Sequence, residues 1–142
     1  MIEIEGAHLL ETLFGHWPDF HEAQVCSVCL DTSRTAMARL ELGIEVAESF
    51  VDARGVHRDR QRCLATFGFS NVRNARVEAF RRQGVLAALD FAELESGDGM
   101  PVGSGRPERC YRVRLVPIRG AEVEFFCDHV AVVKAISISR AI

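Results

Sequence analysis

The residues best suited to chemistry are histidines and a carboxylate close together near the N-terminus. His16, His21 and Glu22 carry imidazole nitrogens and carboxylate oxygens, which are common ligands of transition metals. A metal site would need further ligands, and His57 or His129 would supply them if the fold brought them near. No H-E-x-x-H pattern places two such ligands on one helical face. A small metal- or ligand-binding domain using His16, His21 and Glu22 is therefore one hypothesis for function.

Two cysteines have the spacing of a zinc-knuckle arm or of a redox pair. They lie in Cys26-Ser-Val-Cys29, but no second pair of Cys or His ligands follows at similar spacing. Residues three apart on a strand point to opposite faces, which disfavours chelation. We interpret them as small apolar side chains in a sheet. The five cysteines cannot all pair internally, which favours a reducing compartment: Cys26, Cys29, Cys63, Cys110 and Cys127.

The patterns typical of enzymes are missing from the sequence. Gly103-Ser-Gly105 lacks the spacing of a hydrolase nucleophile elbow, and its glycine-rich surroundings lack the phosphate-loop pattern. Two carboxylate pairs, Glu93 with Glu95 and Glu122 with Glu124, have the alternation of a solvated sheet face. The sequence therefore predicts a non-catalytic protein with no cofactor.

Arginines recur along several strand-like segments and raise the possibility of nucleic-acid binding. They are Arg58, Arg60, Arg62, Arg73, Arg76, Arg112 and Arg114. Acidic residues are interleaved with them, and no aromatic stacking pattern lies on the same faces. The net charge is −3, so we expect no nucleic-acid partner.

The length and composition predict one soluble domain over residues 1–142. Hydrophobic residues make up 48% of the chain and charged residues 26%, as in ordinary globular proteins. No run approaches the roughly 20 apolar residues that span a membrane, and the start shows no signal-peptide pattern. We therefore expect a cytoplasmic protein without a membrane partner.

The hydrophobic periodicity changes once along the chain. Gly6–Phe14 has apolar residues at helical spacing, and Gly15 is placed to end a helix there. Four later runs alternate with period two and predict half-buried antiparallel strands: residues 40–46, 63–69, 111–115 and 123–127. The expected fold is α+β, mainly an antiparallel β sheet of about seven or eight strands with a short N-terminal helix.

Three other segments gave less regular patterns. Val130–Ile138 is apolar on both faces at first, which predicts a central strand. Arg81–Leu89 fits either a bend or one or two helical turns, and Ser96–Glu108 is rich in glycine and fits a mobile loop.

The segment between the helix and the sheet is predicted to be a structural corner. Pro18 ends the helix and extends the residue before it, so Trp17 and Phe20 can fasten the helix to the sheet. His21 and Glu22 are placed to satisfy backbone groups that this turn leaves open.

The same corner resembles a known family. Phe14-Gly-x-Trp-Pro-x-Phe-His-acid-x-x-Val25 is similar to the N-terminal signature of the immunity protein 50 family of bacterial polymorphic toxin systems. Residues 66–80 resemble that family's middle hairpin, and residues 120–132 its C-terminal strands. The acid after His21 is Glu22, where the family pattern leads us to expect Asp. The motif residues are Phe14, Gly15, Trp17, Pro18, Phe20, His21 and Glu22.

The resemblance implies a small cytoplasmic protein that binds and neutralises a cognate toxin domain without catalysis. Such toxins are often nucleases with basic clefts, which an acidic surface would complement. Acidic residues precede Arg34, the first basic residue, and are the expected partner-binding set: Glu3, Glu5, Glu11, Asp19 and Glu22. An edge strand that pairs with its copy would also allow a homodimer.

Overall fold

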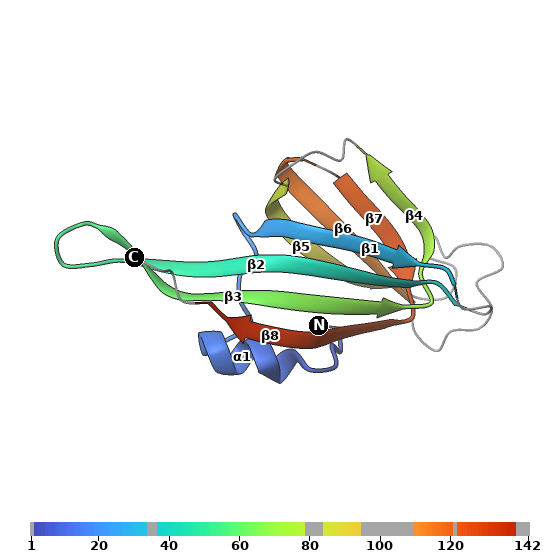
Figure 1. Cartoon of the computed structure of the whole chain (residues 1–142), viewed down its shortest axis with the longest axis horizontal. Coiled ribbons are helices and arrows are strands. Elements are labelled where there is room, and N and C mark those ends of the chain that lie inside the picture. Colours follow the sequence, from blue (N-terminus) through green and yellow to red (C-terminus); the bar gives the residue numbers. More distant parts are fainter. Residues whose placement is uncertain (1, 34–36, 79–83, 95–109, 121, 139–142) are drawn as a thin grey trace.

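The computed structural model describes residues 2–33, 37–78, 84–94, 110–120 and 122–138, with only the backbone described at 50, 57, 59 and 60. This part of the chain forms one helix and one eight-stranded antiparallel sheet (Figure 1). The elements are α1 (Ala7–Phe14), β1 (Gln24–Asp31), β2 (Arg39–Val51), β3 (His57–Ser70), β4 (Arg73–Glu78), β5 (Gly84–Leu94), β6 (Cys110–Arg119), β7 (Glu122–Cys127) and β8 (His129–Ser137). The predicted fold class is confirmed.

The sheet consists of two halves that join weakly. Its strand order is β4-β7-β6-β5-β1-β2-β3-β8. At the junction, the pairs between β1 and β5 in the described part of the chain are Gln24–Val85 and Val25–Gly84. We call β1, β2, β3 and β8 the first half-sheet, and β4, β5, β6 and β7 the second half-sheet.

The two half-sheets pack face to face through aromatic rings. The ring centroids of Phe69 on β3 and Phe125 on β7 are 4.8 Å apart, and those of Phe67 and Phe91 are 6.2 Å apart. All four alternating runs place one set of residues in this core, as predicted. The buried sets are Leu40, Leu42, Ile44 and Val46; Cys63, Ala65, Phe67 and Phe69; Tyr111, Val113 and Leu115; and Val123, Phe125 and Cys127.

The helix begins and ends close to the predicted residues. Gly15 follows α1 with φ 81°, and its N–H donates to the Glu11 carbonyl at 2.7 Å. Gly6 precedes α1 with φ 74° and lies against β8, where a Cβ would be 2.3 Å from the Val132 carbonyl oxygen. A glycine is needed at residue 6 for both reasons. Within the described residues, no helix is long and apolar enough to cross a membrane.

The prediction of a strand at Val130–Ile138 is confirmed, because β8 covers His129–Ser137, but its predicted central position is wrong. β8 is the last strand of the sheet and pairs with β3 on one side. On its other side, the Glu5 N–H donates to the Val130 carbonyl, and the Val132 N–H donates to the Glu5 carbonyl. Figure 1 shows α1 beside this strand. Its apolar residues therefore reflect cover by the N-terminal residues, while Val133 remains 44% exposed.

The prediction of a bend or helical turns at Arg81–Leu89 is also wrong where the structure describes it. Residues 84–89 belong to β5. Register shifts between Val85 and Leu86 and between Leu86 and Ala88 interrupt the period-two alternation that predicts a strand. Residues 81–83 and the expected loop Ser96–Glu108 lie outside the described residues.

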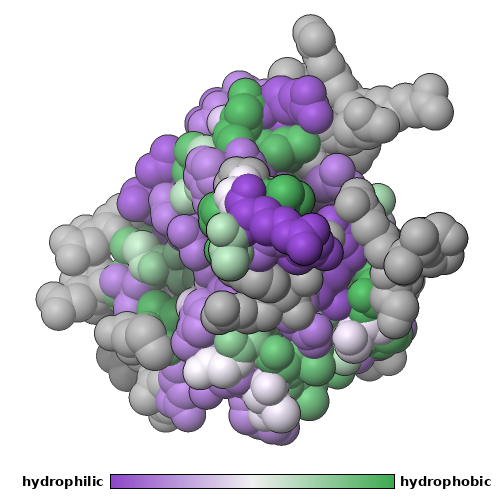
Figure 2. Space-filling model, turned by 90° about the vertical axis from the view of Figure 1, so that its left-hand side faces the viewer, coloured by the Kyte–Doolittle hydropathy of each residue, from purple (hydrophilic) through white to green (hydrophobic). Residues whose placement is uncertain are grey.

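The hairpin of β2 and β3 extends beyond the rest of the molecule (Figure 1). At its turn, the Asp52 carboxylate accepts bonds from the backbone N–H groups of Arg54 and Val56 and from Nε of Arg58. Because of these bonds, chiefly the one from Arg58, the pKa of Asp52 is lowered. Viewed from this end, the described side chains on the surface are a mixture of hydrophilic and hydrophobic residues (Figure 2).

Candidate ligand- and partner-binding site

Residues 2–23, which we call the N-terminal segment, run from β8 to the second half-sheet. Near its start, Glu5 forms backbone hydrogen bonds with β8. Near its end, the Glu22 N–H donates to the Leu86 carbonyl at 2.7 Å, and the Leu86 N–H donates to the Ala23 carbonyl at 2.9 Å. The segment is therefore fastened to both half-sheets.

An aromatic corner fastens the middle of the segment to β3. Phe14, Pro18 and Phe20 are buried, while Trp17 is half-buried. The Trp17 ring packs edge-on against Phe20 and Phe67, with centroid distances of 5.6 and 6.3 Å. Phe20 and Phe67 are 5.8 Å apart. The hydrophobic members of the family-like motif therefore contribute to the core at this corner.

His21 and Glu22 do not hold the corner in the way we expected. Both side chains are exposed. The backbone is held instead by Asp19, whose carboxylate accepts the His21 N–H at 2.9 Å, and by the bond from Glu22 to β5. Glu22 has a positive φ of 66°, a conformation that non-glycine residues seldom adopt. The hydrogen bond from His21 to Asp19 and the one from Glu22 to Leu86 stabilise this strained residue.

The five predicted partner-binding acids are all exposed: Glu3, Glu5, Glu11, Asp19 and Glu22. They follow the N-terminal segment along its course from β8 to β5. Glu5 also forms an ion pair with His129, with 2.8 Å between Oε2 and Nε2. The segment thus presents a row of carboxylates to solvent.

Among the described side chains, two of the predicted metal ligands lie beside different carboxylates. His16 lies beside Glu48 of β2, with 3.0 Å between Nε2 and Oε1, whereas His129 lies beside Glu5. Within the described residues, no group of three His, Cys, Asp or Glu side chains is arranged to hold a metal ion. The side chain of His57 lies outside the described residues.

The two cysteines of β1 are both exposed. A β-bulge at Cys26 changes which face of the strand each of them points to. The bulge inserts Cys26 between Val25 and Ser27, and Cys29 then pairs with Glu41. The extra residue shifts the alternation, so residues three apart need not point to opposite faces. Partial burial raises the pKa of Cys26, with a smaller contribution from the Glu45 carboxylate. Cys63, Cys110 and Cys127 are buried in the core.

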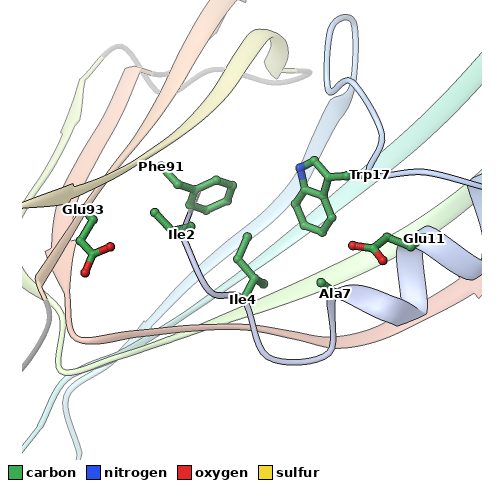
Figure 3. A pocket seen from close by; sticks show the side chains of 7 residues that line it. All are labelled: Ile2, Ile4, Ala7, Glu11, Trp17, Phe91 and Glu93. Atoms are coloured by element: carbon green, nitrogen blue, oxygen red, sulfur yellow. The ribbon is translucent and has the colours of Figure 1, made fainter.

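A pocket of about 310 Å³ opens beside Trp17. Residues from two parts of the chain line it: Ile2, Ile4, Ala7, Glu11 and Trp17 from the N-terminal segment, and Phe91 and Glu93 from β5. Figure 3 shows the two carboxylates at opposite ends, with aliphatic and aromatic side chains between them. The pocket can accommodate a slender apolar group that carries positive charge.

Sequence reasoning missed most of this pocket. Glu93 was assigned with Glu95 to a solvated sheet face, and Glu95 lies outside the described residues. In the structure, Glu93 shares its parity on β5 with Phe91, and these two residues pair with the buried Tyr111 and Val113 of β6. Glu93 is exposed, and it lies near the end of β5 on the face of the strand that points to the core. Its spacing from Phe91 was the signal that could have found it.

Several arginines of the strand faces form ion pairs with carboxylates. Arg73 and Asp128 are 2.7 Å apart, and Arg58 and Asp52 are 2.6 Å apart. Arg62 with Glu45, Arg76 with Glu78, and Arg114 with Glu124 form further ion pairs. The positive charge of these five arginines is therefore offset locally.

Comparison of the chain with protein-family models, curated proteins and solved structures found no match.

Proposed function

We propose that the protein is a non-catalytic, cytoplasmic immunity protein that binds and neutralises a cognate bacterial toxin domain. The observation that supports this proposal is the exposure of all five acids along the N-terminal segment. A basic substrate cleft, such as that of a nuclease toxin, would be complementary to this row of carboxylates. The resemblance of residues 14–25 to an immunity family points to the same class of partner.

The way the segment is held supports a binding role. Its aromatic corner and its bonds to β8 and β5 fix the backbone on which the acids lie. A surface that is already ordered loses less conformational entropy on association than a free chain does. Fixed carboxylates also raise the rate of encounter with a basic partner, and this effect weakens as salt rises.

The proposal predicts that the gene immediately upstream encodes a toxin domain, and the experiment measures binding to that domain. We expect the association rate to fall as the salt concentration rises. We also expect the triple substitution Glu3→Lys, Asp19→Lys and Glu22→Lys to slow association at least about tenfold at low salt. These three acids lie outside the pocket. Substitution of three exposed acids elsewhere, Glu41→Lys, Glu78→Lys and Asp90→Lys, is the matched control.

Two results would count against the proposal. Salt-independent affinity, or full affinity of the triple variant, would remove the electrostatic argument while leaving toxin binding intact. Absence of binding, together with failure to protect cells that express the toxin, would refute the immunity function itself.

The expected homodimer stays a prediction. β4 is the other terminal strand of the sheet and carries charged residues and the 47% exposed Val77. Light scattering would determine whether a second copy pairs with the protein in solution.

A further inference from the structure

The pocket beside Trp17 has charge at both ends and apolar surface between them. Glu11 comes from α1 and Glu93 from β5, so the fold brings together carboxylates that are remote in sequence. Both side chains are exposed and accessible to a ligand. Figure 3 shows that they lie at opposite ends of the pocket rather than side by side. Two separated carboxylates are complementary to two separated cations.

The surface between the carboxylates suits a methylene chain. Ile2 and Ile4 provide aliphatic contacts, and the rings of Trp17 and Phe91 provide aromatic faces and edges. An ammonium group close to an aromatic face gains a cation–π attraction in addition to its ion pair. The volume of about 310 Å³ is at the lower end of the range of small-molecule pockets, about 300–1,000 Å³. The ligand must therefore be small.

We propose that this pocket binds an α,ω-diammonium alkane, the chemical class of the simple aliphatic polyamines. One ammonium group pairs with Glu11 and the other with Glu93, while the methylene chain lies against Ile2, Ile4, Trp17 and Phe91. A monoammonium alkane of the same length leaves one carboxylate without a partner. An anion is repelled at both ends. This proposal does not depend on toxin binding.

Trp17 makes the test direct because it is the only tryptophan in the chain and forms part of the pocket wall. The probes are diaminoalkanes from diaminopropane to diaminooctane, titrated at low salt while Trp17 fluorescence is recorded. Calorimetry on the same samples detects any binding that leaves the fluorescence unchanged. We expect saturable binding whose affinity passes through a maximum at one chain length. The monoamine of that length should bind about tenfold more weakly, as the loss of one ion pair implies.

Variants of the two carboxylates test the two-point contact. Glu11→Gln and Glu93→Gln keep the side-chain shape and should each weaken diamine binding about tenfold. The double variant should remove the preference for diamine over monoamine. Glu41→Gln is the matched control, since Glu41 is exposed on β2 and does not line the pocket. Circular dichroism verifies that each variant is folded.

Three outcomes would overturn the proposal. They are the absence of saturable binding by both methods, equal affinity for diamine and monoamine, and an equal loss of affinity in Glu41→Gln. The last result would show that diamines bind the net negative charge of the protein rather than this pocket. None of these outcomes bears on toxin binding, whose test uses acids outside the pocket.

Discussion

The aromatic cluster between the half-sheets has a closed end and an open end. At the closed end, Phe69 and Phe125 are both fully buried, with ring centroids 4.8 Å apart. At the open end, Trp17 and Phe91 remain partly exposed and form walls of a pocket. Similar side chains therefore form a closed core at one end and the walls of a solvent-accessible pocket at the other.

The difference comes from the residues that flank the rings. At the closed end, neighbouring strands supply further buried residues, among them Val113 and Val123. At the open end, β5 continues from Phe91 to the charged Glu93, and the N-terminal segment contributes Glu11. Carboxylates resist burial without partners, so this end of the cluster stays open to solvent. The comparison predicts that substitutions at the closed end affect stability, whereas those at the open end affect binding.

Phe125→Ala should have the largest effect, because it leaves a cavity at the closed end. We expect the free energy of unfolding to fall by about 3–5 kcal/mol in urea denaturation. Phe126→Ala is the matched control, since Phe126 is the next residue of β7 and is only partly buried. An equal loss in both variants would contradict the assignment of Phe125 to a specifically packed core.

High pH should also destabilise the closed end, through Cys127. Burial, with smaller contributions from Cys110 and Asp128, raises the pKa of its thiol from 9.0 to about 12. Above pH 9 the unfolded chain loses this proton while the folded chain keeps it. The protonated Cys127 thiol therefore makes its full contribution to the free energy of unfolding below pH 9. This contribution is lost as the pH rises toward 12, at up to about 1.4 kcal/mol per pH unit.

Urea denaturation at several alkaline pH values measures this slope. Cys127→Ala should make it shallower, whereas Cys29→Ala, at an exposed position, should leave it unchanged. An unchanged slope in Cys127→Ala would show that other groups cause the alkaline destabilisation.

Gly6→Ala tests how the N-terminal segment is held against β8. The φ of 74° and a Cβ 2.3 Å from the Val132 carbonyl oxygen should together cost about 2–3 kcal/mol of unfolding free energy. Gly15→Ala is the control, since its φ is 81° but no atom lies within 4 Å of the added Cβ. Its cost should be limited to about 1 kcal/mol of backbone strain. Equal losses of unfolding free energy in the two variants would mean that the contact with β8 adds nothing to the cost of Gly6→Ala.

Trp17→Ala should separate the two roles of the cluster. A fully buried ring would cost about 3–5 kcal/mol, but Trp17 is half-buried, so we expect a loss of about 1–2 kcal/mol. Diamine binding, followed by calorimetry because the fluorophore is gone, should weaken at the same time. A loss as large as that of Phe125→Ala would show that both ends of the cluster are equally important for stability.

Glu11→Gln should have the smallest effect on stability, within about 0.5 kcal/mol, because the side chain is exposed. Any larger change in the thermal midpoint would mean that the carboxylate stabilises the fold. It would then be unsuitable as a residue that acts only in binding.

Much of the fold follows from local patterns in the sequence. The apolar stripe before Gly15 predicted α1, and period-two alternation predicted which residues of β2, β3, β6 and β7 are buried. The cluster of Trp17, Pro18 and Phe20 predicted a hydrophobic corner. These features depend on residues close together in the chain, where side-chain periodicity and backbone preferences act directly.

Only the tertiary structure decided which segments meet. β8 is an edge strand because the N-terminal segment, rather than another strand, bonds to its free side. Bulges in β1 and β5 shift the alternation, so local spacing could not place Cys26 or residues 84–89 correctly. Glu11 and Glu93 share a pocket because the half-sheets fold together and the segment joins them. Such contacts depend on long-range packing, which no local pattern in the chain encodes.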